Sequence, residues 1–244
     1  MNDNRGLYTV AYGAPARECA QRLLESWERH MRATPALVAT DEAAAFDVST
    51  VTLPRPDIGA REPKLRMYEV TPPAWDVLYL DADVEIMQPV HFFFEALEAG
   101  FDLVLTRNPG KYHTTREMAR PNNRVEVEAT WRLMGGDDLL QWNGGVVAFR
   151  RSPEVERFFG LWLAGWREAR NQDQPALHRA LWAQPLRVLT LGSEWNCSTR
   201  YSDGREREIV RHHQTEAREM QTKLPPGVAG DSDQAWRMLR KDRT

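Results

Sequence analysis

Short apolar runs alternate with segments of helical periodicity along most of this chain. Apolar runs that end in glycine or in polar residues predict buried strands, and apolar residues spaced three and four apart predict helices. The predicted strands cover residues 7–13, 35–40, 46–51, 76–80, 101–106, 142–149, 186–191 and 208–212. The predicted helices cover residues 17–32, 64–70, 92–99, 153–169 and a segment that begins near residue 173. This alternation is typical of an α/β fold with a mostly parallel central sheet flanked by helices.

The stretch over residues 108–138 breaks this pattern. It is polar and is punctuated by the sequences Asn-Pro-Gly, Pro-Asn-Asn and Gly-Gly-Asp-Asp. A loop of that length inside a compact domain is typically a lid or a binding loop. We therefore expect one domain over residues 1–215, with an irregular lid or acceptor segment at 108–138. A C-terminal extension over residues 216–244 would follow, and it could form a helix that packs on the domain.

Composition narrows the classes of protein that fit this chain. Hydrophobic residues make up 42% of the 244 positions and charged residues 27%, as in ordinary globular proteins. The 35 acidic and 32 basic residues leave a net charge of −3, so no overall field predicts a nucleic-acid partner. No apolar run approaches the roughly 18 residues of a transmembrane helix, and no signal peptide is recognisable. We expect a cytoplasmic protein, for which peripheral contact with a membrane stays open.

The strongest chemical signal follows the predicted strand at 76–80. The apolar run ends at once in Asp81, Ala82 and Asp83. Ligands of open α/β sheets gather at the carboxyl ends of strands, and in an extended chain the two carboxylates point to the same side. Like charges held this close favour a divalent cation between them, and such a cation would hold a phosphorylated ligand. The alternative is that both are capping or solvated loop acids before the next helix.

Two further polar groups lie later in the chain. Asn143 precedes Gly144 and Gly145 at a strand entrance, where another group can approach the backbone closely and Asn143 could bind a polyhydroxy ligand. A simple β-turn is the alternative. Asp173 and Gln174 open a helix, a favourable position for an anionic ligand, unless Asp173 is only an N-cap.

A pair of histidines closes the series of candidate residues. His212 and His213 lie at the end of a predicted strand, where neighbouring side chains face opposite sides, so only one of them can reach a metal. A lone histidine is more often a packed or surface residue. The pair therefore matters only if this strand ends beside Asp81 and Asp83.

Taken together, these residues resemble glycosyltransferases of the GT-A fold, in particular the retaining group that includes glycogenin and bacterial galactosyl- and glucosyltransferases. That group has a Val-Leu-Tyr-Leu-Asp-x-Asp strand, an Asn-x-Gly-Val strand, an Asp-Gln helix start, a Trp-Asn or Tyr-Asn pair and a late metal-binding histidine. The matching positions are residues 77–83, residues 143–146, Asp173-Gln174, Trp195-Asn196, and His212 or His213.

The resemblance implies a single Rossmann-like GT-A domain that transfers a hexose, with retention, from a nucleotide-diphosphate sugar to a glycan, lipid or small-molecule acceptor. The donor implied is a UDP-sugar, and the cofactor is Mn²⁺ or Mg²⁺ on Asp81, Asp83 and one histidine. His212 is preferred because it precedes Thr215 by three residues, where the family has His-x-x-Gly. Gln174 would lie near the anomeric carbon and Asp173 would orient donor hydroxyls. The donor-binding residues implied are Ala11, Tyr12, Gly13, Lys64, Asp81, Ala82, Asn143, Gly144 and Gly145.

The chain departs from the family at two places. The first strand lacks the acidic or Asn residue that often reads uracil, and residues 215–220 do not match the family's Gly-x-x-Lys-Pro-Trp ending, for which Arg218 or Lys223 could substitute. Two other interpretations stay open. One is a phosphatase of the haloacid-dehalogenase type, whose Asp-x-Asp normally lies on the first strand. The other is a transferase homologue that binds a sugar nucleotide or glycan without turnover.

Overall fold

The computed structural model describes residues 4–53, 61–108, 114–119, 124–135, 139–169, 172–199 and 207–213. The expected extension over residues 216–244 lies outside these described residues, as do Thr215, Arg218, Lys223 and parts of the 108–138 segment. Within the described part of the chain, no helix combines the length and the apolar character that crossing a membrane requires.

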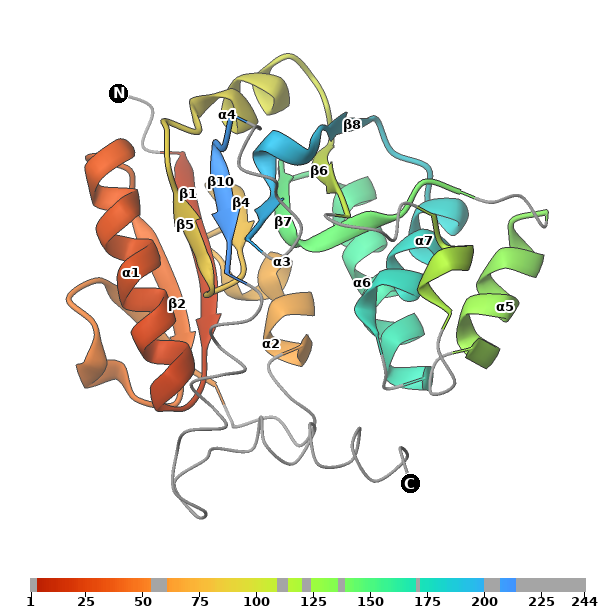
Figure 1. Cartoon of the computed structure of the whole chain (residues 1–244), viewed down its shortest axis with the longest axis horizontal. Helices are drawn as coiled ribbons and strands as arrows, with labels where there is room; N and C mark the ends of the chain where they lie inside the picture. The colour runs from red at the N-terminus through yellow and green to blue at the C-terminus, as the bar shows by residue number, and fades with distance from the viewer. Residues whose placement is uncertain are drawn as a thin grey trace.

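A seven-stranded sheet runs through the centre of the molecule (Figure 1). Its strands are β1 (Arg5–Ala11), β2 (Ala36–Thr40), β3 (Ser49–Thr52), β4 (Asp76–Leu80), β6 (Leu103–Arg107), β7 (Trp142–Phe149) and β8 (Val188–Leu191). They lie in the order β3-β2-β1-β4-β7-β6-β8, and every pairing is parallel except the two that β7 makes. The mostly parallel α/β sheet predicted from the sequence is therefore confirmed.

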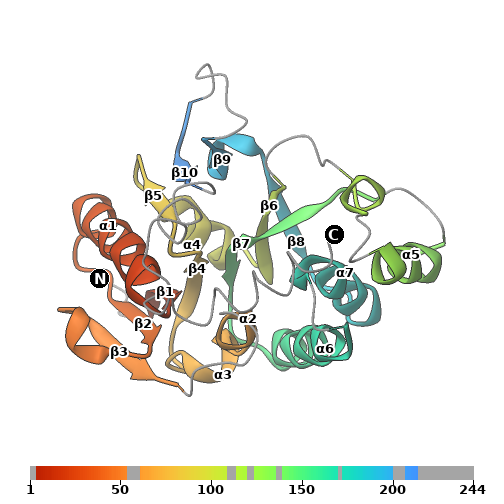
Figure 2. The same ribbon diagram turned by 60° about the horizontal axis from the view of Figure 1, so that its bottom comes forward.

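Helices cover both faces of this sheet because its central strands are apolar on both faces. Along β4, Val77 and Tyr79 face one core and Leu78 and Leu80 face the other. The first core is closed by α2 (Arg61–Leu65), α3 (Met67–Val70), α6 (Pro153–Ala169) and α7 (Asp173–Ala183), and the second by α1 (Ala14–His30) and α4 (His91–Glu98). In Figures 1 and 2, α1 and the pair α6 and α7 lie at opposite ends of the molecule.

A second, three-stranded sheet was not predicted. It consists of β5 (Val84–Ile86), β10 (Val210–His212) and β9 (Cys197–Ser198), in the order β5-β10-β9. Two of these strands are too short to leave an apolar pattern, and β10, which was predicted as a strand, belongs to this sheet. Because β10 runs antiparallel to β5 with His212 opposite Val84, the late strand ends beside the turn that carries Asp81 and Asp83.

Two predicted elements differ from the structure. The helix expected over residues 64–70 is divided at Arg66 into α2 and α3. The 108–138 segment is not irregular throughout, because it contains a short 3₁₀ helix, η2 (Arg116–Met118), and α5 (Arg124–Leu133). Several apolar residues of α5 lie outside a buried face, since Val125 and Leu133 are exposed, and polar turn sequences flank the helix. Packing against α7 stabilises it. The other 3₁₀ helices are η1 (Ala43–Ala45) and η3 (Ser193–Trp195).

Candidate metal and donor site

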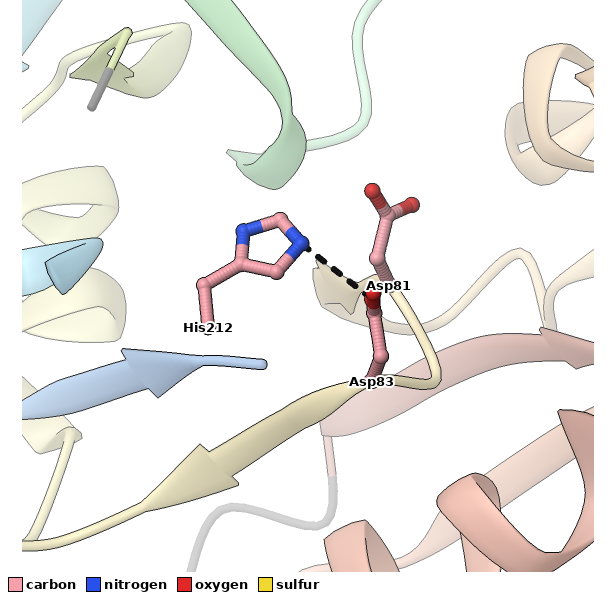
Figure 3. A group of neighbouring side chains, drawn as sticks. All are labelled: Asp81, Asp83 and His212. Atoms are coloured by element: carbon pink, nitrogen blue, oxygen red, sulfur yellow. Dashed lines mark ion pairs between the residues drawn. The ribbon is translucent and has the colours of Figure 1, made fainter. Parts of the chain in front are cut away.

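The turn between β4 and β5 brings two carboxylates and one imidazole together (Figure 3). Ligand atoms of Asp81, Asp83 and His212 all lie within 4.8 Å of one another, and His212 Nε2 lies 3.2 Å from Asp83 Oδ1. The chain is not extended here, because the Val84 N–H donates to the Asp81 carbonyl and closes a turn. Asp81 and Asp83 nevertheless converge. Neither of them caps a helix, since α4 begins at His91 with Val90 as its cap.

His212 is fixed in orientation by a second polar side chain. The ring Nδ1 lies 2.9 Å from Asn196 Oδ1, and Asn196 Nδ2 donates to Thr106 Oγ1 at 2.9 Å. Because the amide nitrogen is used by Thr106, Asn196 presents its oxygen to the ring, which places a proton on Nδ1 and directs Nε2 toward Asp83. Asn196 is fully buried and belongs to the Trp195-Asn196 pair that the resemblance singled out.

The titration of His212 and Asp83 reflects their closeness. Burial alone would lower the pKa of His212, but the carboxylate of Asp83 raises it above its ordinary value. Burial would raise the pKa of Asp83, but His212 holds it below its ordinary value. A positive charge between the ring and the carboxylates is therefore favourable, and a divalent cation bound by the neutral ring is another way to supply it. Two carboxylates with one imidazole form a donor set that fits such a cation.

His213 lies outside this group. Its Nε2 is 3.1 Å from Glu85 Oε2, and its backbone N–H donates to the Asp83 carbonyl. Adjacent residues of a strand face opposite sides, so the strand directs His212 and not His213 toward Asp81 and Asp83. Of the two histidines that the sequence left open as the metal ligand, the geometry therefore favours His212.

Asp81 is held in place by contacts from β4, α2 and β7. Its Oδ1 accepts a hydrogen bond of 2.6 Å from the Tyr79 hydroxyl and lies 3.7 Å from Lys64 Nζ, and its N–H donates to the Gly145 carbonyl. A Cβ at Gly145 would lie only 2.4 Å from Asp81 Oδ2. The sequence predicted that glycine at this strand lets another group approach the backbone closely. In the structure, that group is the carboxylate of Asp81.

A buried ion pair lies beside this group. Lys64 Nζ is 2.7 Å from Asp173 Oδ2, and both side chains are only 9% exposed. A Cβ at Gly144 would lie 2.8 Å from that oxygen and 3.0 Å from Nζ. Burial favours the neutral form of each group, yet the pKa of Asp173 is lowered by Lys64 and that of Lys64 is raised by Asp173. Both therefore stay charged.

Asp173 does not act as the N-cap that the sequence allowed. Gln172 occupies that position, and the Asp173 carbonyl accepts a hydrogen bond from Trp162 Nε1 at 2.8 Å, which fixes the start of α7 on α6.

Gln174 and Asn143 both donate a hydrogen bond to the same residue, Asn108, which the sequence analysis did not single out. Asn108 Oδ1 accepts hydrogen bonds from Asn143 Nδ2 at 3.1 Å and from Gln174 Nε2 at 3.3 Å. Asn143 Oδ1 accepts from the Gly145 N–H at 2.7 Å, inside β7 and not in a β-turn. Asn108 directly follows β6. A polar residue at the end of a strand could therefore have identified Asn108 as a candidate from the sequence.

The end of β1 lies beside the same turn. Ala11 and Ala82 pack in one small apolar cluster, and the Thr9 hydroxyl donates to the Leu80 carbonyl. The Gly13 N–H lies 3.2 Å from each carboxylate oxygen of Asp41, a second polar residue missed by the sequence reasoning. Tyr12 is buried, which together with Asp41 raises its pKa to about 12, and its hydroxyl has no hydrogen-bond partner among the described residues. Ala11, Tyr12, Gly13 and Ala82 thus border the site, and their contact with a donor stays a prediction.

Comparison with known proteins identifies the fold. No family model and no curated sequence matches the chain. The solved structure of the galactosyltransferase LgtC in complex with donor and acceptor sugar analogs matches with a TM-score of 0.53 at 17% identity, over 85% of this chain and 86% of that chain. Mouse xyloside xylosyltransferase 1 matches with a TM-score of 0.55 at 13% identity, over 91% and 100%. The glycosyltransferase GlyE of Streptococcus pneumoniae TIGR4 matches with a TM-score of 0.58 at 15% identity, over 86% and 54%. The chain therefore has the GT-A fold of these glycosyltransferases, as the resemblance implied.

Proposed function

We propose that this protein is a divalent-metal-dependent glycosyltransferase that moves a hexose from a nucleotide-diphosphate sugar to an acceptor, with retention of configuration. The observation that carries the proposal is the group of Asp81, Asp83 and His212, held beside the Lys64–Asp173 pair on a GT-A fold. UDP-sugars are the first donors to test, since the resemblance points to them.

The metal-binding role is assigned to Asp81, Asp83 and His212. When bound, a divalent cation supplies Lewis-acid stabilisation of the negative charge that develops on the diphosphate leaving group. The protein contributes a prearranged set of ligands: Tyr79 holds Asp81, and Asn196 holds His212. Prearrangement matters because ligands that are already oriented need no reorganisation during the reaction.

The sugar-binding role is assigned to the residues around β7 and the start of α7. Asp173 accepts hydrogen bonds from donor hydroxyls, and Lys64 keeps its carboxylate charged and in place. The Gln174 amide, held through Asn108 beside Asn143, faces the reacting carbon. Ala11, Tyr12 and Gly13 border the place for the nucleoside, where Asp41 supplies the acidic group that β1 itself lacks.

Retention is inferred from the resemblance to the retaining group, and the side chains bear only on how it would occur. Asp173 is paired with Lys64, and Gln174 carries a neutral amide, so neither is a strong nucleophile. For a retaining reaction, the acceptor hydroxyl would then attack from the face that the leaving group departs, without a covalent intermediate. Proton NMR of the first-formed product tests this, and a product of inverted anomeric configuration would contradict it.

The rival interpretations have less support. A haloacid-dehalogenase-type phosphatase places its Asp-x-Asp on the first strand, whereas here the two carboxylates follow β4. A homologue that binds without turnover would share this fold, and only assays of turnover separate it from an enzyme. Release of nucleoside diphosphate from a bound donor would exclude it.

The deciding experiment is a thermal-shift screen of nucleotide sugars with and without Mn²⁺. A ligand at a hundredfold excess over its Kd stabilises the folded protein by roughly 2.7 kcal/mol, so a true donor should raise the melting temperature by several degrees. We expect the shift to require Mn²⁺ and to disappear in Asp83→Ala. Glu85→Gln is the matched control, because Glu85 lies on β5 next to the site but contacts His213. If no donor shifts the wild type, or if Asp83→Ala shifts equally, the proposal fails.

A further inference from the structure

Helix α5, in the segment expected to form a lid, carries a buried carboxylate toward α7. Glu126 lies in the first turn of α5, and its Oε1 accepts a hydrogen bond of 3.0 Å from Arg179 Nη2 on α7. The Glu126 side chain is 9% exposed and that of Arg179 is 20% exposed. Arg179 also donates to Thr130 Oγ1 at 2.6 Å and to the Gly165 carbonyl at 3.0 Å. Arg179 thus joins α5 to α6 and α7, which lie side by side in Figure 2.

The second oxygen of Glu126, Oε2, is buried and has no hydrogen-bond partner among the described residues. A carboxylate oxygen left without a donor in a buried place is costly, so it calls for an explanation such as a bound ligand or water. Burial raises the pKa of Glu126, although Arg179 opposes this effect. A hydroxyl group that donates to Oε2 would remove the cost.

Glu126 also lies within electrostatic reach of the donor site. Arg61 Nε is 3.9 Å from Asp173 Oδ1 on the side of Asp173 not used by Lys64. Asp173 raises the pKa of Glu126 and Arg61 lowers it, so both charges act on this carboxylate. Ion pairs connect Asp81 through Lys64 and Asp173 to Arg61, and a separate ion pair joins Glu126 to Arg179.

We propose that Glu126 is an acceptor-binding residue, whose free carboxylate oxygen accepts a hydrogen bond from a hydroxyl group of a neutral sugar acceptor. This inference rests on the proposed function and adds the class of acceptor to it. Asp173 and Gln174, at the start of α7, serve the donor sugar, while Glu126 approaches the same helix from the segment that the sequence assigns to the acceptor. Arg179 keeps the Glu126 side chain in position.

The charge of the site selects among acceptors. A neutral hydroxyl can donate to Oε2, whereas a carboxylate or phosphate near this oxygen would meet a like charge in a desolvated place. An acceptor whose recognised sugar is uncharged is therefore preferred over an otherwise identical sugar acid. The selection against anions should weaken when Glu126 becomes neutral.

The test uses the full chain, Mn²⁺ and the donor that stabilises the wild type. Methyl glycosides of glucose, galactose and mannose serve as neutral acceptors, and methyl glucuronide as the anionic counterpart. Release of nucleoside diphosphate is measured without acceptor, which reports donor hydrolysis, and with each glycoside. In Glu126→Gln we expect kcat/KM for the neutral acceptor to fall by about tenfold, mainly through KM, while donor hydrolysis is unchanged. We also expect the preference for the neutral sugar over methyl glucuronide to shrink.

Glu128→Gln is the matched control, since Glu128 lies on the same helix and pairs only with Arg124 and Arg132 among the described residues. It should leave both rates unchanged. If Glu126→Gln reduced donor hydrolysis and transfer equally, Glu126 would act in donor binding or in stabilising the fold, and the inference would be overturned. A wild type that hydrolyses the donor but accepts none of the glycosides would also overturn it, and the proposed function would survive. A wild type that binds no nucleotide sugar would instead remove the proposed function itself.

Discussion

Two charged groups lie next to each other at the carboxyl end of β4, and they differ in how their charges are balanced. Lys64 and Asp173 balance one another within the protein at 2.7 Å. Asp81, Asp83 and His212 instead bring two carboxylates to one imidazole, with Lys64 at 3.7 Å from Asp81 as the link between the groups. The first group is complete without a ligand, while the second favours an added positive charge. We therefore expect loss of the ion pair to affect stability as well as the sugar binding proposed for Asp173, and loss of the three-residue group to affect mainly activity.

The largest expected effect is on catalysis. Asp83→Ala removes one of the three candidate metal ligands and should lower kcat by about 10³-fold, equivalent to about 4 kcal/mol of transition-state stabilisation. Steady-state assays over a range of Mn²⁺ concentrations measure this. A variant that regains wild-type rate at high Mn²⁺ would show that Asp83 contributes only affinity for the metal, and one with wild-type kinetics throughout would remove it from the site.

The next effect is on stability. Lys64→Met leaves the Asp173 carboxylate buried without its main partner, and breaking a buried pair in this way typically costs about 3–5 kcal/mol in free energy of unfolding. Urea denaturation measures the loss. The double variant Lys64→Met with Asp173→Asn should recover most of it, because no unpaired charge remains. An exposed ion pair typically contributes under about 1 kcal/mol. If Lys64→Met lowers the free energy of unfolding by less than that, the Lys64–Asp173 pair does not behave as a buried ion pair.

Two buried histidines sharpen the contrast between a group with a carboxylate partner and one that has none among the described residues. The pKa of His212 is raised by Asp83, whereas burial lowers the pKa of His178 on α7 to about 4. His178 is neutral when folded but protonates near pH 6.5 when unfolded, so the unfolded state binds more protons between these values and stability falls as the pH falls.

The free energy of unfolding should therefore drop by about 2 kcal/mol from pH 7.5 to pH 5 through His178 alone. Comparison of the wild type with His178→Gln in urea denaturation at both pH values isolates this contribution. An equal pH dependence in the two proteins would contradict the lowered pKa.

The smallest effect concerns the glycine beneath Asp81. A Cβ at Gly145 would lie 2.4 Å from Asp81 Oδ2, so Gly145→Ala should displace the carboxylate and weaken metal-dependent donor binding by about tenfold, or about 1.4 kcal/mol. Gly160→Ala is the control, because a Cβ there meets nothing within 4 Å and the residue lies inside α6. That change should leave binding unaffected and stabilise the helix by up to about 1 kcal/mol. Titration of the donor by calorimetry distinguishes the two.

Much of the fold could be predicted from local pattern. The strands β1, β2, β4, β6, β7 and β8 and the helices α1, α4, α6 and α7 lie close to their predicted positions, because each carries an apolar run or an apolar face that must be buried. The short strands β5 and β9 and helix α5 were missed. The two strands are too short to carry a periodic signal, and α5 lies between polar turn sequences and is held by packing against α7, a contact that the local sequence does not reveal.

The candidate site divides in the same way. The sequence by itself determined that Asp81 and Asp83 end a buried strand, that Asp173 and Gln174 begin a helix, and that one of two histidines could serve. Only the tertiary structure decided that Asp173 pairs with Lys64, that β10 directs His212 and not His213 toward the carboxylates, and that Asn108 joins Asn143 to Gln174. The physical reason is that a sequence records which polar side chains stand at the ends of elements, whereas the partner of each is set by how those ends pack together.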